Sequence, residues 1–173
     1  MQFLRTQSFF FSCLFLLASL LHGSKKEVIQ GIGMEAENPL EYDNEKETIT
    51  ASGNAVLSGD GIHLNAERII WDRKTSIVRA DGNIALGVVG YRLLAKSLTL
   101  DLQSGAFTAE NVKTGLYPWI IEAEQLLASD SNYTIENATF THENHERFSP
   151  GLLIDKAIYE TNSTRLQARG IGL

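Results

Sequence analysis

The segment Ile49–Asp72 reads ITASGNAVLSGDGIHLNAERIIWD. Apolar or small residues alternate with polar ones on both sides of residues 58–61, and a period of two is typical of a β-strand with one buried face. The sequence Ser-Gly-Asp-Gly at 58–61 predicts the turn between two such strands. A bulge near Glu67 would restore the phase of the pattern, so that Ile69 and Trp71 face the interior again.

Two short units recur along the chain in alternation. The first is an apolar residue, a small or apolar residue two positions later, and Gly or Asn two positions after that. The second begins with Ala in most copies and ends in two apolar positions and an acid, as in AERIIWD and AKSLTLD. The central residues of the first unit, at 51, 80, 109, 135 and 168, lie about 30 positions apart. Each repeat is therefore predicted to be a pair of strands, giving roughly ten to twelve strands in all.

These repeats predict an all-β domain of stacked antiparallel strand pairs. Alternation of apolar and polar residues gives each strand one buried and one solvated face. Two such sheets form a sandwich or a jelly roll, and regular repetition also permits a stacked, solenoidal arrangement. Asp72–Ser76 and Asp101–Gly105 are predicted to be matching turns between repeats. Small in-facing residues such as Ala51 and Ala80 would leave room between the two sheets.

The N-terminal segment has the layout of a secretory signal peptide. Phe9–Leu21 is an apolar run of 13 residues, followed by small residues and by Lys25 and Lys26. A membrane-spanning helix needs about 20 apolar residues. Residues 1–24 are therefore predicted to be a signal peptide, with a retained N-terminal anchor as the alternative, and residues 25–173 to form the β-domain. The one cysteine, Cys13, lies in the apolar run, so a cleaved chain would hold no disulfide, which favours the periplasm.

Composition and motifs argue against several classes of function. A net charge of −6 without a cluster of basic residues does not favour nucleic-acid binding. His142–Glu146 is the one metal-like cluster, but its spacing matches no common zinc motif, so we expect a solvated loop there. No nucleophile lies beside a base and no catalytic set can be assembled. We therefore expect no enzyme activity, no metal and no cofactor.

The quoted segment resembles the core motif of the OstA-like family, the periplasmic lipopolysaccharide-transport (Lpt) proteins. Strand pairs of that family read apolar–x–apolar–x–Gly-Asn–apolar, a short turn, and then apolar–x–apolar–Asn-Ala-acid–basic–apolar. Ile49–Leu57 and Ile62–Trp71 match this pattern. VRADGNIALGVVGYRLLAKSLTLD, at Val78–Asp101, is a fainter copy. The resemblance covers residues 32–130 and fades after Asn132; it is closest to the family's soluble bridge component.

The resemblance implies a β-jelly roll open at both ends, with lipid acyl chains in a V-shaped apolar groove between two sheets. The implied function is non-enzymatic: carrying lipopolysaccharide through the periplasm of a Gram-negative bacterium, from the inner to the outer membrane. Its implied partners are lipopolysaccharide, through the lipid A acyl chains, and other Lpt jelly rolls stacked edge to edge. Head-to-tail self-association is also implied. Apolar residues of the first strand face the lipid in that family, and Ile32 and Met34 match them here.

The candidate lipid-binding residues are apolar positions expected to face inward. For any one of them, plain core packing is the alternative explanation. The predicted set is Ile32, Met34, Ile49, Ala51, Leu57, Ile62, Leu64, Ile69, Val78, Leu86, Leu98, Leu100 and Phe107.

Three other functions stay open. The chain ends at RLQARGIGL, directly after the first unit of a fifth repeat, so the partner strand of that unit is absent. Either the last strand is an exposed docking edge, or the domain is incomplete and the chain is an N-terminal fragment of the outer-membrane insertion protein. A retained N-terminal segment would make it a membrane-anchored Lpt adaptor. A fully packed interior would make it a structural β-repeat protein without a ligand.

Overall fold

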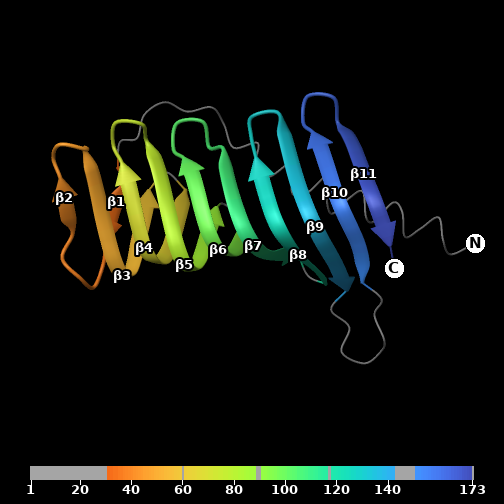
Figure 1. Ribbon diagram of the computed structural model, residues 1–173, viewed down its shortest axis with the longest axis horizontal. Helices are drawn as coiled ribbons and strands as arrows, with labels where there is room; N and C mark the ends of the chain where they lie inside the picture. The colour runs from red at the N-terminus through yellow and green to blue at the C-terminus, as the bar shows by residue number, and fades with distance from the viewer. Residues whose placement is uncertain (1–30, 60, 89–90, 117, 143–150, 173) are drawn as a thin grey trace, which may run out of the picture.

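A computed structural model describes residues 31–172 apart from residues 60, 89–90, 117 and 143–150 (Figure 1). In this part of the chain all regular structure is β, in eleven strands, which confirms the predicted fold class. The predicted signal peptide, residues 1–24, lies outside the described residues. The strands are β1 Gly33–Glu35, β2 Glu41–Asp43, β3 Thr48–Gly59, β4 Ile62–Asp72, β5 Ile77–Val88, β6 Tyr91–Asp101, β7 Phe107–Leu116, β8 Trp119–Ala128, β9 Asn132–His142, β10 Leu152–Glu160 and β11 Arg165–Gly172.

The strands form one antiparallel sheet in which chain neighbours are also sheet neighbours. The order is β1, then β3 to β11 in sequence, and β2 pairs with β3 beside β1. β1 pairs with residues 56–58 of β3 and β2 with residues 48–50. The sheet is not closed, because in this order β11 pairs with β10 alone. In the described residues no helix is long and apolar enough to cross a membrane.

The two predicted layers are the two halves of this one sheet. One face of the strands is buried down to 0% exposure at Ala51, Leu64 and Ile69, although among the described residues no helix or second sheet covers it. The sheet must therefore fold over on itself, and Figure 1 shows β3 to β7 doubling back at their lower ends. Strands of 10 to 12 residues are long enough to cross both layers. The sequence pattern did not distinguish one folded sheet from two separate sheets.

The fold-over is made at a crease in the middle of the strands. β3 and β5 each hold one extra residue there, at Gly53-Asn54 and at Gly82-Asn83, so the register shifts against their neighbours. All four residues have positive φ, and an extra residue of this kind bends a strand. β7 and β9 lack the extra residue, and β10 and β11 run nearly straight in Figure 1. The crease is therefore sharpest in the first two repeats.

The predicted change of phase in β4 is confirmed. Two successive residues, Glu67 and Arg68, are exposed between the buried Ala66 and Ile69. They lie across from the bulges of both neighbouring strands. The extra residue itself belongs to β3 and β5 and not to β4.

Small and large side chains alternate across the first layer of the core. One row of register partners, followed from β3 to β7, contains in order Ala51, Ile69, Ala80, Leu98 and Ala109. All five are at most 2% exposed. Large residues on alternate strands fill the space that the alanines leave, as in densely packed protein interiors.

Five-residue turns join the repeats at one end of the sheet. In the turn at 101–105, the Asp101 carboxylate accepts hydrogen bonds from the backbone N–H groups of Gln103 and Ser104, at 2.8 and 3.3 Å, and the fifth residue, Gly105, has a φ of 74°. The turn at 72–76 repeats this arrangement from Asp72, with Ser76 at a φ of 60°. Both turns match the sequence prediction. Asp is favoured at such positions because its side chain bonds the backbone just ahead of it.

These turns are expected to lose stability in acid. The Ser104 hydroxyl and the backbone N–H groups that bond Asp101 lower the pKa of this carboxyl. A group with a lowered pKa in the folded state stabilises the fold above its unfolded value of about 3.9, and the contribution disappears as pH falls through the folded value. Asp101→Ala should therefore unfold at a lower urea concentration than wild type at pH 7, with a difference that shrinks at around pH 3. A difference that stays constant with pH would contradict this assignment.

Candidate lipid-binding interior

The structure places all thirteen predicted groove residues inside the folded sheet. Ile32, Met34 and Ile62 are partly buried and pack against the core. The residues that are at most 8% exposed are Ile49, Ala51, Leu57, Leu64, Ile69, Val78, Leu86, Leu98, Leu100 and Phe107. The inward positions are thus identified, and lipid binding by these residues stays a prediction.

The side chains of the inward face that lie nearest to the five-residue turns form a continuous row across the sheet, here called the turn-end row, and its first member, Tyr42 at the edge, is 63% exposed. Its members are joined in register from strand to strand. It differs from the row of alternating alanines because it contains most of the interior's aromatic rings, and the hydroxyl or N–H of Tyr and Trp gives these rings a polar tip. Its members are Tyr42, Ile49, Trp71, Val78, Leu100, Phe107, Ala128, Tyr133, Tyr159 and Leu166.

Trp71 and Tyr133 of the turn-end row place polar atoms among apolar side chains. The Nε1 atom of Trp71 is buried and has no hydrogen-bond partner among the described residues. Trp71 lies in register between Ile49 and Val78, which are 8% and 0% exposed. Burial raises the pKa of the Tyr133 phenol, and the negative charge of Asp130 adds to the effect. The turn-end row is therefore apolar apart from the polar atoms of its Trp and Tyr side chains.

The outside of the crease holds a repeated hydrogen bond that the sequence analysis missed. The Asn54 side-chain amide donates to Glu37 at 2.6 Å, Asn83 donates to Glu67 at 2.5 Å, and Asn137 donates to Glu124 at 2.5 Å. Each Asn has positive φ, which Asn tolerates better than most residues. The sequence signal for this repeated hydrogen bond is the recurrence of Ala-Glu at 36–37, 66–67 and 123–124. The partners lie 13 to 17 residues apart, so only the strand register reveals the pairs.

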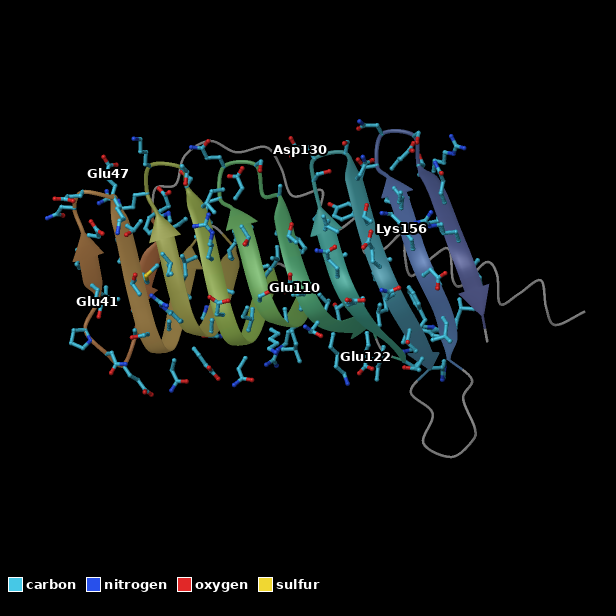
Figure 2. The ribbon with its side chains drawn as sticks, viewed as in Figure 1. Glu41, Glu47, Glu110, Glu122, Asp130 and Lys156 are labelled. Carbon is cyan, nitrogen blue, oxygen red and sulfur yellow. The ribbon has the colours of Figure 1, made fainter. Side chains whose placement is uncertain are left out.

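Charged side chains of the described residues lie along the outer face of the sheet. Figure 2 shows Glu110 and Lys156 on the outside of the sheet. The Lys156 ammonium of β10 lies 2.6 Å from the Glu136 carboxylate of the neighbouring strand β9. In the described residues no three His, Cys, Asp or Glu side chains are placed to hold a metal ion. The rings of His142 and Trp119 are in T-shaped contact, with their centroids 4.9 Å apart. Residues 143–146 of the predicted loop lie outside the described part of the chain.

The two edges of the sheet differ in shape and charge. On β11, Ala168 and Ile171 are exposed, the latter at 62%, although their register partners Ala157 and Ile154 are buried. Here the apolar interior reaches the surface. At the opposite edge, β1 and β2 are three-residue strands that carry Glu35, Glu41 and Asp43.

Comparison with known proteins gives similarity to solved structures alone. No protein-family model matches this chain, and a search of curated proteins finds no significant match. Among solved structures, the chain is similar to LptH of Pseudomonas aeruginosa, described as the LptA-homologous periplasmic component of the lipopolysaccharide transport device. The two are 12% identical, the match covers 80% of this chain and 82% of LptH, and the TM-score is 0.34. Similarity at this level establishes no function for this chain.

Proposed function

We propose that this chain is a non-enzymatic carrier that holds the acyl chains of lipopolysaccharide inside its folded sheet and moves them across the periplasm. The observation that carries the proposal is the interior itself. An apolar inward face runs through the strands from β3 to β11 and reaches the surface at Ile171, which is 62% exposed. Burial of an acyl chain stabilises its complex by about 0.8 kcal/mol per CH₂, so a dozen methylenes contribute about 10 kcal/mol without polar chemistry.

The fold offers a way for such a chain to enter. Because the crease lies in the middle of the strands, both ends of each strand lie on the side of the two layers that is opposite the crease. The alanines at 51, 80 and 109 have small side chains, so few of their contacts are lost when the two layers separate. The hydrogen bonds at the crease hold the other side of the sheet together. We therefore infer that lipid enters by opening the sheet on its turn side.

The edges support association with similar domains. An uncovered edge strand pairs readily with a strand of another chain. β11 carries Arg165 and Arg169, whereas the opposite edge carries Glu35, Glu41 and Asp43. Opposite charges favour contact between unlike edges over contact between like edges. This arrangement supports head-to-tail association with a second copy, or with a related jelly-roll domain.

Aspartate in the first strand tests the carrier function. Met34 lies in β1 in register with Leu57 and is partly buried, so Met34→Asp puts a carboxylate at the mouth of the interior. We expect binding of lipopolysaccharide to weaken by more than about tenfold, because a charge beside an acyl chain costs several kcal/mol. The melting temperature should fall little, because β1 is an edge strand of three residues. Ile32→Asp should behave in the same way.

Native mass spectrometry of the purified protein mixed with lipopolysaccharide measures this effect. Gly33→Asp is the matched control, since a Cβ at Gly33 meets no atom within 4 Å and the residue is exposed. It should keep the lipid adduct. Loss of folding in step with loss of binding in Met34→Asp would count against a lipid-facing role. A folded wild-type protein without any adduct would favour a structural β-repeat.

A further inference from the structure

The buried indole N–H of Trp71 is an unusual feature of an otherwise apolar interior. Its Nε1 atom has no acceptor among the described residues. A buried donor left without a partner costs about 1–3 kcal/mol, and more than 90% of buried polar groups in native proteins have one. A single ordered water needs two to four polar partners. The residues beside Trp71 on this face, Ile49, Val78 and Ile69, offer none from their side chains.

The position of Trp71 indicates which part of a ligand would reach it. Trp71 is the last inward residue of β4 before the turn at 72–76, so it belongs to the turn-end row. From this row to the crease the interior is lined by alanine and aliphatic side chains, and no other unpartnered buried side-chain donor is found in the described residues. An acyl chain that enters between the separated layers would meet apolar side chains along its length. Only its carbonyl end carries an acceptor.

We infer that Trp71 donates a hydrogen bond to the carbonyl oxygen of an ester- or amide-linked acyl chain bound in the interior. This inference rests on the proposed carrier function and gives the lipid an orientation. The carbonyl lies at the turn end, the alkyl tail points toward the crease, and the head group lies outside among the turns. Amide and ester linkages share this carbonyl oxygen, whereas an ether-linked chain lacks it and keeps only the weaker ether acceptor.

The dimensions of the sheet agree with this orientation. From Ile49, the register partner of Trp71, to Gly53 at the crease, β3 spans about 13 Å at roughly 3.3 Å per residue. One leaflet of a bilayer contains about 15 Å of hydrocarbon, half of the roughly 30 Å core. A membrane-length acyl chain whose carbonyl lies at Trp71 therefore ends near the crease.

Calorimetric titration with two soluble lipids tests the inference. The probes are a lauroyl lysophosphocholine, whose chain is ester-linked, and its dodecyl ether analogue, both kept below their micelle concentrations. Wild type should bind the ester about five- to tenfold more tightly than the ether, which is the range for one buried hydrogen bond. Trp71→Phe should remove that preference by weakening ester binding alone. Trp119→Phe, the same substitution in β8 outside the turn-end row, should keep it.

The outcomes separate this inference from the carrier function. Equal binding of ester and ether by wild type would overturn the hydrogen bond and leave the carrier function intact. Equal weakening of both lipids in Trp71→Phe would also overturn it, since Trp71 would then provide contact area alone. Failure of wild type to bind either lipid would overturn both proposals. Without lipid, Trp71→Phe should melt at or above the melting temperature of wild type. If Trp71→Phe does not fold, the comparison of the ester and the ether on wild type tests the hydrogen bond.

Discussion

Ile69→Asp is expected to prevent this chain from folding, whereas Ile70→Asp, one residue later, is expected to leave it folded. Ile69 is 0% exposed and lies in register between Ala51 and Ala80 inside the core. A carboxylate there has no partner to offset its desolvation, and the loss should reach about 4 kcal/mol or more. That is comparable with the whole stability of a domain, about 5–15 kcal/mol.

Ile70 provides a matched control because it belongs to the same strand and points outward. Its register partners are Thr50 and Arg79, and the latter is exposed. Circular dichroism during heating should show a cooperative transition for Ile70→Asp near that of wild type and none for Ile69→Asp. Similar transitions in both variants would mean that the phase change at Glu67 and Arg68 is wrongly placed. The pair of variants therefore tests the bulge as well as the core.

Gly82→Ala is expected to cost about 2–3 kcal/mol through the crease. Gly82 has a φ of 76°, which costs a residue with a Cβ roughly 1–2 kcal/mol. A Cβ at this position would also lie within 3 Å of the Glu67 side chain, so the carboxylate would have to leave its hydrogen bond with Asn83. Loss of that bond should add about 1 kcal/mol. Urea unfolding at neutral pH measures the total.

Gly105→Ala separates backbone strain from loss of the crease contact. Gly105 has nearly the same φ, 74°, but a Cβ there meets no atom within 4 Å. This variant should lose roughly 1–2 kcal/mol, from strain alone. An equal loss in the two glycine variants would show that the pairing of Glu67 with Asn83 adds nothing to stability. A larger loss at Gly105 would contradict both assignments.

The strand pairs could be predicted because period-two patterning and turn chemistry are local. Ile49–Leu57 lies within one strand, and Asp72–Ser76 forms the expected turn. The phase change between Ala66 and Ile69 was also visible, because two successive polar residues interrupt the alternation. Such features depend on neighbours in sequence, and the structure agrees with them.

The arrangement of the layers and the unpartnered indole N–H of Trp71 could not be predicted in this way. One folded sheet and two separate sheets give the same alternation, and only the pairing of β3 to β11 in a single order distinguishes them. The bond from Asn83 to Glu67 joins residues 16 positions apart, and it follows from register. Trp71 matched a core position like any other, because lack of a hydrogen-bond partner depends on all surrounding atoms.

The single strand order of the sheet has a consequence for how such a protein changes size. Each added hairpin would extend the sheet by two strand spacings, about 10 Å, and would repeat the same cross-section. A closed barrel changes its diameter when strands are added, whereas this open sheet, whose strands pair in chain order from β3 to β11, would change only in length. Duplication of one hairpin-coding segment would therefore lengthen the interior and its reach without redesigning the core.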